Sequence, residues 1–193
     1  DIIAKTKSGP SASRAKYMGQ LIAERLTGKP MEGYTSAAME RGTILEADAR
    51  KLYAFMTDTE VMETGFERHP RIVYAGASPD GLVGNDGLCE IKSPLTHNHI
   101  ETLTGQSIDG RYVTQMQWQM ACTGRIWCDY VSYDPTLPEA MQLFVKRVRA
   151  DSATIGELER EVIVFLSELD AKLDVLCKKY GAQVVTFDKK EAA

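Results

Sequence analysis

Apolar residues recur at the spacing of an amphipathic helix in four segments of this chain. They predict helices over residues 11–28, 36–56, 109–124 and 151–180. Ser11 or Ser13 can cap the first helix, Gly28 with Pro30 can end it, and Gly181 follows the last one. The chain is therefore expected to begin and end with a helix.

Between these helices, short runs of apolar residues are bounded by turn residues. They predict strands over residues 60–66, 71–75, 126–133 and 141–148, and a hairpin over 80–92. The order is helices, three strands, a helix, two strands and a helix. This predicts an α/β fold of the mixed α+β kind, with a central mixed β-sheet flanked by helices. With 193 residues and no linker-like tract, we expect a single domain over 1–193.

The hairpin carries the most informative chemical pattern. Gly84-Asn85-Asp86-Gly87 is a turn sequence, and folding the chain about Asn85 places Asp80 opposite Glu90. Directly opposed residues have Cβ atoms about 4.5–5.5 Å apart. Two carboxylates at this separation repel each other unless a cation or a shared proton intervenes. The hairpin therefore predicts a site for a hard, oxygen-binding cation.

Side-chain alternation along the strand adds a lysine to this face. Lys92 points the same way as Glu90. Cys89 and Ile91 point to the opposite face, which we expect to be buried. Two simpler explanations stay open, because Pro79-Asp80-Gly81 is also an ordinary turn and Glu90 with Lys92 can be a solvated ion pair. A slip of one residue would also turn Glu90 to the other face.

A third acid lies on the helix predicted over 36–56. Glu46 shares a side of this helix with Ala49 and Tyr53 of the apolar stripe. A carboxylate at the rim of an apolar stripe is costly unless it is paired. Glu46 therefore either joins the acidic site or pairs with an arginine.

Composition narrows the classes of protein. The hydrophobic share of 44% and charged share of 26% are those of a soluble globular protein. No apolar run approaches the roughly 18–20 residues of a membrane span, so no membrane partner is expected. The net charge of −4 argues against a uniformly basic surface, although basic residues gather at 5–29 and 146–149 and acids at 151–170. This asymmetry suits either a protein that is basic in a channel and acidic outside or a helix with a solvated acidic face.

The four cysteines argue against two kinds of site. None forms a Cys-x-x-Cys pair, which speaks against a zinc ribbon and against thioredoxin-type chemistry. An iron–sulfur cluster would need all four to converge. Buried thiols in a reducing cytoplasm are the favoured interpretation.

Several short motifs follow one another in a fixed order. They are Gly42-x-x-x-Glu46, Ser78-Pro79-Asp80-Gly81-Leu82, Glu90-Ile91-Lys92-Ser93-Pro94, Tyr112-x-x-Gln115-x-Gln117, Asp129-Tyr130 and Tyr133-Asp134-Pro135. The Pro-Asp…Glu-x-Lys part resembles the signature of the PD-(D/E)XK nuclease superfamily. The ordered set, over roughly residues 15–175, resembles the phage lambda exonuclease family, the YqaJ-type viral recombinases.

The resemblance implies a restriction-endonuclease-like core and a specific activity. Members of that family are Mg²⁺-dependent, processive 5′→3′ exonucleases that hydrolyse one strand of linear double-stranded DNA. The resemblance further implies two metal ions, with Mn²⁺ as a substitute, a ring-shaped homotrimer, and a single-strand annealing protein as partner in phage-type homologous recombination. It also implies a phage or prophage origin and the cytoplasm of a bacterial host.

The same resemblance implies the metal ligands. Asp80, Glu90 and the main-chain carbonyl of Ile91 would ligate metal, and Glu46 would help to hold a second ion or its waters. Mg²⁺ favours few carboxylates together with retained waters, which agrees with this set. No cysteine or histidine ligand lies nearby in the sequence, which argues against zinc.

Three further residues complete the implied catalytic group. Lys92 would position or deprotonate the attacking water and stabilise the phosphate in the transition state. Gln115 would hold Lys92 or that water, and Tyr112 would shape the same wall.

One departure concerns the N-terminus. Members of the family carry a segment with an Arg and a Thr-Ala-Ser run that binds the 5′-phosphate end. No such stretch precedes residue 15, so we expect either that this segment is missing from the chain or that the DNA end is anchored in another way. His97-Asn98-His99 is expected in a loop after the active strand. The candidate DNA contacts are Lys5, Lys7, Arg14, Lys16, Ser78, His97, His99, Lys146 and Arg147.

Two other functions stay open. A structure-selective or restriction-type endonuclease could use the same core. A catalytically silent DNA-binding module is disfavoured, because such a relative usually loses one of the four residues Glu46, Asp80, Glu90 and Lys92.

Overall fold

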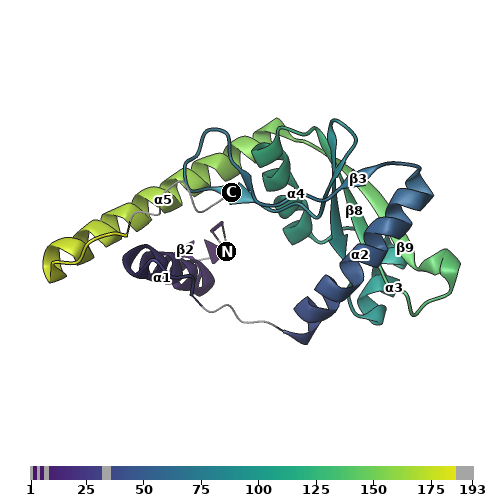
Figure 1. Ribbon diagram of the computed structural model, residues 1–193, viewed down its shortest axis with the longest axis horizontal. Coiled ribbons are helices and arrows are strands. Elements are labelled where there is room, and N and C mark those ends of the chain that lie inside the picture. Colours follow the sequence, from purple (N-terminus) through teal and green to yellow (C-terminus); the bar gives the residue numbers. More distant parts are fainter. Residues whose placement is uncertain (1, 4, 7–8, 32–35, 186–193) are drawn as a thin grey trace. The chain divides into compact units, whose positions relative to one another are not determined.

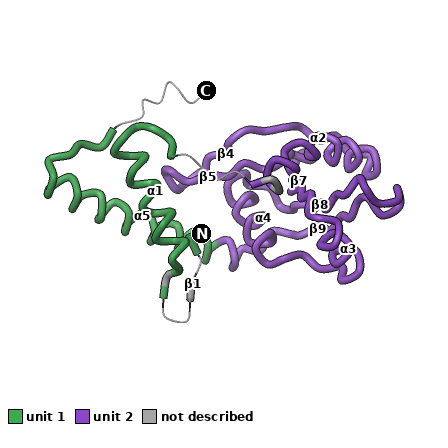
Figure 2. Tube along the Cα trace, turned by 90° about the horizontal axis from the view of Figure 1, so that it is seen from below, with its two compact units in different colours: residues 1–34, 156–193 green, residues 35–155 purple. Residues whose placement is uncertain are grey.

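The computed structural model describes residues 2–3, 5–6, 9–31 and 36–185. The chain forms two compact units, one of residues 1–34 and 156–193 and one of residues 35–155 (Figure 2). The single domain expected over 1–193 stays a prediction.

The first unit is built on two helices. Helix α1 spans Ala12–Thr27 and pairs with the part of helix α5, Ser152–Tyr180, that lies in this unit. Their facing stripes bury Met18, Ile22, Phe165, Leu169 and Leu173. A small antiparallel sheet, β1 (Lys5–Thr6) and β2 (Gly9–Pro10), precedes α1.

The caps of α1 are those expected from the sequence. The Ser11 hydroxyl accepts a hydrogen bond from the backbone N–H of Arg14 at 3.2 Å. Gly28 ends the helix with φ 68°, a left-handed conformation that suits glycine.

The second unit contains a five-stranded mixed sheet (Figure 1). Its strands, in spatial order, are β3 (Val61–Met62), β6 (Gly81–Val83), β7 (Gly87–Lys92), β8 (Trp127–Tyr133) and β9 (Leu143–Arg149). Strands β7 and β8 pair in parallel and the other neighbours are antiparallel. The parallel pair needs a crossover between β7 and β8, and α3 (Thr96–Gly105) and α4 (Gly110–Thr123) lie in that connection.

Helices cover both faces of this sheet. Helix α2, Ala37–Thr57, packs Ala49 and Tyr53 against a face that includes Cys89 and Ile91. Helix α4 packs Met116 and Met120 against the other face, which includes Leu88, Cys128 and Tyr130. Alternate residues of β7 thus serve two separate cores, as the period of a strand requires. The predicted fold class, a central mixed sheet flanked by helices, is confirmed.

Two predicted strands were wrong in detail. Residues 71–75 form bends and a turn, and Tyr74 has φ 66°, which a strand does not contain. The strands lie on either side of that turn, as a two-stranded sheet of β4 (Glu67–Arg68) and β5 (Gly76–Ala77). The strand predicted over 60–66 is reduced to Val61–Met62.

The other differences are small. Helix α3 replaces the loop that was expected around His97-Asn98-His99, and a short 3₁₀ helix at Glu139–Met141 precedes β9. None of the helices in the described segments has both the length and the apolar character needed to span a lipid bilayer.

Candidate functional site

The hairpin register brings Asp80 and Glu90 together. Gly81 pairs with Cys89, Leu82 with Leu88 and Val83 with Gly87, so the next step of the ladder sets Asp80 opposite Glu90. The Asp80 carboxylate accepts a hydrogen bond from the backbone N–H of Ile91 at 2.6 Å. Asp80 therefore bonds across to β7 rather than to its own turn.

Glu90 is fully buried and both of its oxygens are engaged. Oε1 accepts a hydrogen bond from the Lys92 ammonium, and Oε2 accepts one from Gln119 Nε2 of α4 at 2.5 Å. The Lys92 ammonium also lies over the Tyr112 ring, 5.3 Å from its centroid. The alternative of a solvated Glu90–Lys92 pair does not apply to Glu90, because its carboxylate is fully buried while Lys92 is partly exposed.

Glu46 reaches the site from α2, together with Arg50. The Arg50 guanidinium binds the Glu46 carboxylate at 2.5 Å and donates to the Asp80 carbonyl at 3.0 Å. A third bond joins it to Glu63. The arginine partner considered for Glu46 is thus present, and the same arginine ties α2 to the residue that begins the hairpin.

These groups meet at a cavity of about 470 Å³. Its wall is formed by Met39, Gly42, Thr43, Glu46, Asp80, Ile91, Lys92, Ser93, Pro94, Tyr112 and Gln115. Glu46, Asp80, Ile91, Lys92, Tyr112 and Gln115 are six of the seven residues that the sequence assigned to the site. Glu90, the seventh, is buried, binds Lys92 and does not line the cavity.

The pKa values reflect crowded, buried acids. Burial, and then the charge of Glu90, raise the pKa of Asp80 from 3.8 to about 6. Burial and the charge of Asp80 raise the pKa of Glu46. Burial works against the Lys92 ammonium, but its attraction to Glu90 and Asp80 is stronger and raises its pKa. Lys92 is therefore a cation at neutral pH.

The donor set suits a hard divalent cation. Asp80, Glu46 and Ile91 border the same cavity, and burial, followed by the charge of a neighbouring acid, raises the pKa of both carboxyl groups. Oxygen donors of this kind match Mg²⁺ or Mn²⁺. Within the described residues, no three His, Cys, Asp or Glu side chains are yet arranged to enclose an ion. Lys92 and Arg50 instead bind the acids that would take part.

Two residues of this region were not assigned from the sequence. Gln119 follows Gln115 by one helical turn. The only feature of the sequence that connects it with the site is that it shares a side of the helix with Tyr112. Arg50 follows Glu46 by four residues, a spacing typical of helical ion pairs. Both signals are common in helices, so neither predicts a contact with the site.

The structure changes the list of candidate DNA contacts. Arg14 is buried, bonds to the Ile2 carbonyl at 3.0 Å and to Glu168 at 2.7 Å, and packs over Phe165. These contacts occupy its guanidinium within the first unit, so we no longer consider Arg14 a DNA contact.

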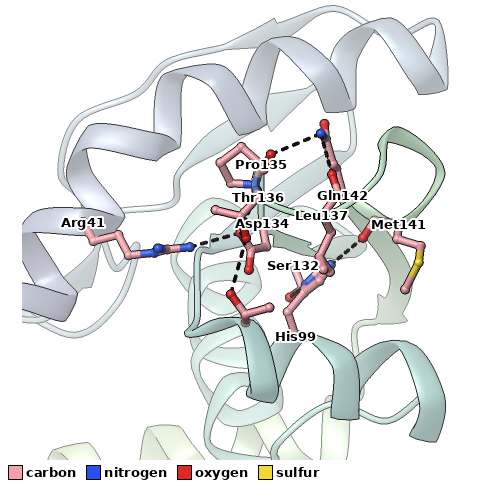
Figure 3. A network of polar contacts seen from close by, with 10 residues as sticks. Arg41, His99, Ser132, Asp134, Pro135, Thr136, Leu137, Met141 and Gln142 are labelled. Carbon is pink, nitrogen blue, oxygen red and sulfur yellow. Dashed lines mark hydrogen bonds and ion pairs between the residues drawn. The ribbon is translucent and has the colours of Figure 1, made fainter.

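His99 is likewise enclosed by protein groups. Its ring is fully buried, with Nδ1 2.7 Å from the Ser132 hydroxyl and Nε2 2.9 Å from the Met141 carbonyl (Figure 3). Arg41 of α2 reaches Asp134 in the same region at 3.3 Å (Figure 3). His99 thus anchors α3 to β8 and to the segment before β9, and we withdraw it as a DNA contact.

The remaining candidates keep exposed positions. Lys16, Ser78, His97 and Lys146 are exposed. Lys146 donates to the Gln106 carbonyl at 2.5 Å. The side chain of Lys5 and all of Lys7 lie outside the described residues.

Arg147 is exposed in part and tied to the interior. It makes two hydrogen bonds to the buried Asp129, at 2.8 and 2.9 Å, and lies 3.5 Å from the centroid of the Trp127 ring. Tyr53 donates to the same carboxylate at 2.7 Å. Arg147 therefore has a structural role in this network. Only the exposed part of its side chain could contact DNA.

The cysteines do not form a cluster of their own. Cys89, Cys122 and Cys128 are buried in the second unit, while Cys177 lies on α5 in the first. All four are free thiols. Burial raises the pKa of Cys89 to about 12, which agrees with inert core thiols.

Comparisons with known proteins place this geometry in a family. The model of the YqaJ-like viral recombinase domain matches residues 3–126. An alkaline exonuclease from Laribacter hongkongensis, LHK-Exo, is 50% identical over 91% of this chain and 88% of its own, with a TM-score of 0.85. LHK-Exo in complex with dAMP gives 51% identity over 89% and 87% of the two chains, also with a TM-score of 0.85.

A more distant structure shares the fold. The phage related exonuclease from Haemophilus somnus 129PT is 14% identical over 91% of this chain and 92% of its own, with a TM-score of 0.72. No curated protein matches the chain. The family predicted from the ordered motifs is confirmed, because the domain model spans more than half of the 193 residues. The chain belongs to the YqaJ-like viral recombinase domain family.

Proposed function

We propose that this protein is a metal-dependent exonuclease that hydrolyses one strand of linear double-stranded DNA from its end. Family membership and the 50% identity to an alkaline exonuclease identify it as a nuclease. DNA as substrate is supported by LHK-Exo in complex with dAMP, because a deoxynucleoside monophosphate is what an exonuclease releases from DNA.

One observation carries the assignment to this site. Asp80 and Glu90 are opposed in the hairpin, Lys92 binds Glu90, and Asp80, Lys92 and Glu46 border one cavity. Burial raises the pKa values of Asp80 and Glu46, and the charge of Glu90 adds to this at Asp80 and the charge of Asp80 at Glu46, so a nearby cation would favour the ionised form of both acids.

The residues divide the chemistry between them. Asp80, Glu90, the Ile91 carbonyl and Glu46 would hold Mg²⁺, or Mn²⁺ in its place, and such an ion lowers the pKa of a bound water and neutralises charge on the phosphate. Lys92 is held as an ammonium by Glu90 and Asp80, so it stabilises negative charge on the scissile phosphate and orients the water. Gln115 lines the same cavity and can hold that water, while Tyr112 packs beside Lys92.

Finer properties follow the family resemblance and are proposed with it. They are two metal ions, processive 5′→3′ digestion, a homotrimeric ring around the duplex, and cooperation with a single-strand annealing protein in recombination. A phage or prophage origin and action in the bacterial cytoplasm belong to the same proposal.

An end-labelled duplex tests the central claim. Linear double-stranded DNA carries a label at either the 5′ or the 3′ end and is incubated with and without Mg²⁺. We expect release of the 5′ label first, and only with metal. Earlier release of the 3′ label would reverse the proposed polarity, and release in the presence of a chelator would contradict metal-dependent hydrolysis.

A closed circular duplex separates the two nuclease classes. An exonuclease leaves the circle intact while it degrades the linear form, whereas a restriction-type endonuclease cuts both. Asp80→Asn and Lys92→Ala should lose digestion but still bind DNA in Ca²⁺. Normal digestion by either variant would remove that residue from the mechanism.

A further inference from the structure

Helix α4 buries two glutamines in the second unit, and they have different kinds of partner. Gln117 is 2% exposed, and both ends of its amide bind backbone: Nε2 donates to the Arg149 carbonyl at 2.8 Å, and Oε1 accepts from the Asp151 N–H at 2.9 Å. This glutamine joins α4 to the end of β9 and the start of α5. Its contacts are those of a structural residue.

Gln119 is just as buried but is only half satisfied. It is 1% exposed and Nε2 donates to Glu90 Oε2 at 2.5 Å, whereas Oε1 is buried and has no hydrogen-bond partner among the described residues. A carboxylate oxygen only accepts, so the amide nitrogen must face Glu90. A buried acceptor without a partner is unfavourable, and an apolar residue of the same size would avoid that cost. A glutamine at this position therefore differs from an apolar residue by its hydrogen bond to Glu90.

The contact also determines which oxygen of Glu90 can turn to the cavity. Oε2 is tied to α4 by Gln119, whereas Oε1 faces Lys92, which lines the cavity. When Lys92 releases Oε1, that oxygen alone is available to an ion. A carboxylate restricted in this way can bind through one oxygen only, which suits the strict octahedral geometry of Mg²⁺. Ca²⁺ accepts carboxylates through one or two oxygens and more ligands in total.

We propose that Gln119 is a positioning residue that ties back one oxygen of Glu90 and so favours small divalent cations over Ca²⁺. This inference rests on the proposed function, since it requires that Glu90 bind metal. Gln119 does not line the cavity, so it would act on an ion only through Glu90.

Matched methionine variants test the role. Gln119→Met and Gln117→Met remove one buried amide each, from the same helix and with similar volume. Binding of Mn²⁺ and of Ca²⁺ to the whole protein is measured by calorimetry without DNA, and unfolding temperature is measured without metal. We expect Gln119→Met to weaken Mn²⁺ binding about tenfold, as removal of a metal ligand's hydrogen-bond partner typically does. Its Ca²⁺ affinity should fall less, so that the preference for Mn²⁺ decreases.

The control variant should show the opposite pattern. Gln117→Met loses two backbone partners, so it should unfold at a lower temperature but keep the Mn²⁺ and Ca²⁺ affinities of the unmodified protein. If Gln119→Met does not fold, Gln119→Asn replaces it, because its shorter amide cannot reach Glu90 and should weaken Mn²⁺ binding in the same way.

The outcomes distinguish the inference from the function beneath it. Unchanged Mn²⁺ and Ca²⁺ affinities in the folded Gln119 variant would make this residue a simple core residue and overturn the inference. An equal loss of Mn²⁺ and Ca²⁺ affinity would overturn the claim that the single available oxygen of Glu90 favours the smaller ion. If the unmodified protein binds neither ion at this site, the proposed function fails first.

Discussion

Replacement of Asp80 by asparagine separates stability from activity. In the metal-free protein, Asp80 is an ionised acid near Glu90, and burial together with that charge raises its pKa from 3.8 to about 6. Asparagine keeps an oxygen that can accept the hydrogen bond from the Ile91 N–H, which is 2.6 Å long. It removes only the charge. Asp80→Asn should therefore stabilise the metal-free protein while it abolishes metal-dependent digestion.

The magnitude follows from the pKa. A pKa that rises from 3.8 to about 6 corresponds to ~3 kcal/mol against the ionised side chain, at ~1.4 kcal/mol per pH unit. Asp80 is partly exposed, so screening by solvent reduces this to about half, or ~1.5 kcal/mol. For a chain of this size, such a gain raises the melting temperature by ~3–6 °C.

The stability difference between Asp80→Asn and the unmodified protein should change with pH in a defined direction. Above pH 6, Asp80 is ionised in both the folded and unfolded chain, and the folded state carries the full penalty. As pH falls from about 6 to 3.8, Asp80 takes up a proton in the folded state first, so the penalty disappears. The advantage of Asp80→Asn should be largest at pH 8 and should be lost near pH 4.

Thermal unfolding in chelator, measured for both proteins between pH 4 and 8, tests this prediction. Addition of Mg²⁺ at pH 8 should stabilise the unmodified protein and leave Asp80→Asn almost unchanged, because binding to the folded state alone raises its stability. The reasoning is refuted if the variant is less stable than the unmodified protein at pH 8. It is also refuted if the difference does not depend on pH.

Three further changes test other parts of the second unit. Lys92→Ala should slow digestion by at least ~100-fold in a gel assay with linear duplex, since it removes the charge that we propose stabilises the transition state; a loss below tenfold would contradict this. Gly87→Ala should destabilise the protein by ~1–3 kcal/mol in chemical unfolding, because a Cβ there would meet the Trp127 ring at 2.0 Å. Arg50→Lys should cost ~1–2 kcal/mol, since an ammonium cannot replace the fork that joins Glu46 to the Asp80 carbonyl; an unchanged stability would show that the fork is dispensable.

The elements predicted best are those whose signals are local. The hairpin register followed from one turn sequence and a period of two residues, and it set Asp80 against Glu90 as expected. Helices α1 and α2 begin after Ser11 and Ser36, which cap them through their side chains. Helix α4, Gly110–Thr123, agrees closely with the helix predicted over 109–124, and Gly124 caps its C-terminus in a left-handed conformation.

The elements that were missed depend on distant residues. Helix α3 has no side-chain cap at Leu95, and it is held in place by His99, which contacts β8 and the Met141 carbonyl. Strands β4 and β5 contain only two residues each. They are fixed by α4, where Trp118 donates to the Gly76 carbonyl at 3.0 Å and stacks on His69 at 5.1 Å. Such contacts join residues about forty positions apart, which no short window of sequence can reveal.

The candidate site combines residues that local sequence signals predict with residues that depend on distant contacts. Its acids could be recognised in the sequence because a carboxylate on a strand face or beside an apolar stripe is costly unless it has a partner. Asp80, Glu90 and Glu46 all stand at positions of this kind. Their partners carry no such signal: the Ile91 N–H is backbone, Arg50 is an ordinary helical ion pair, and Gln119 is one of three nearby glutamines. The partners nevertheless fix where each acid points, and therefore which oxygens can face an ion. Sequence thus predicts which groups are candidate metal ligands, whereas the oxygens that they can offer depend on contacts made only after α2, α4 and the hairpin have packed together.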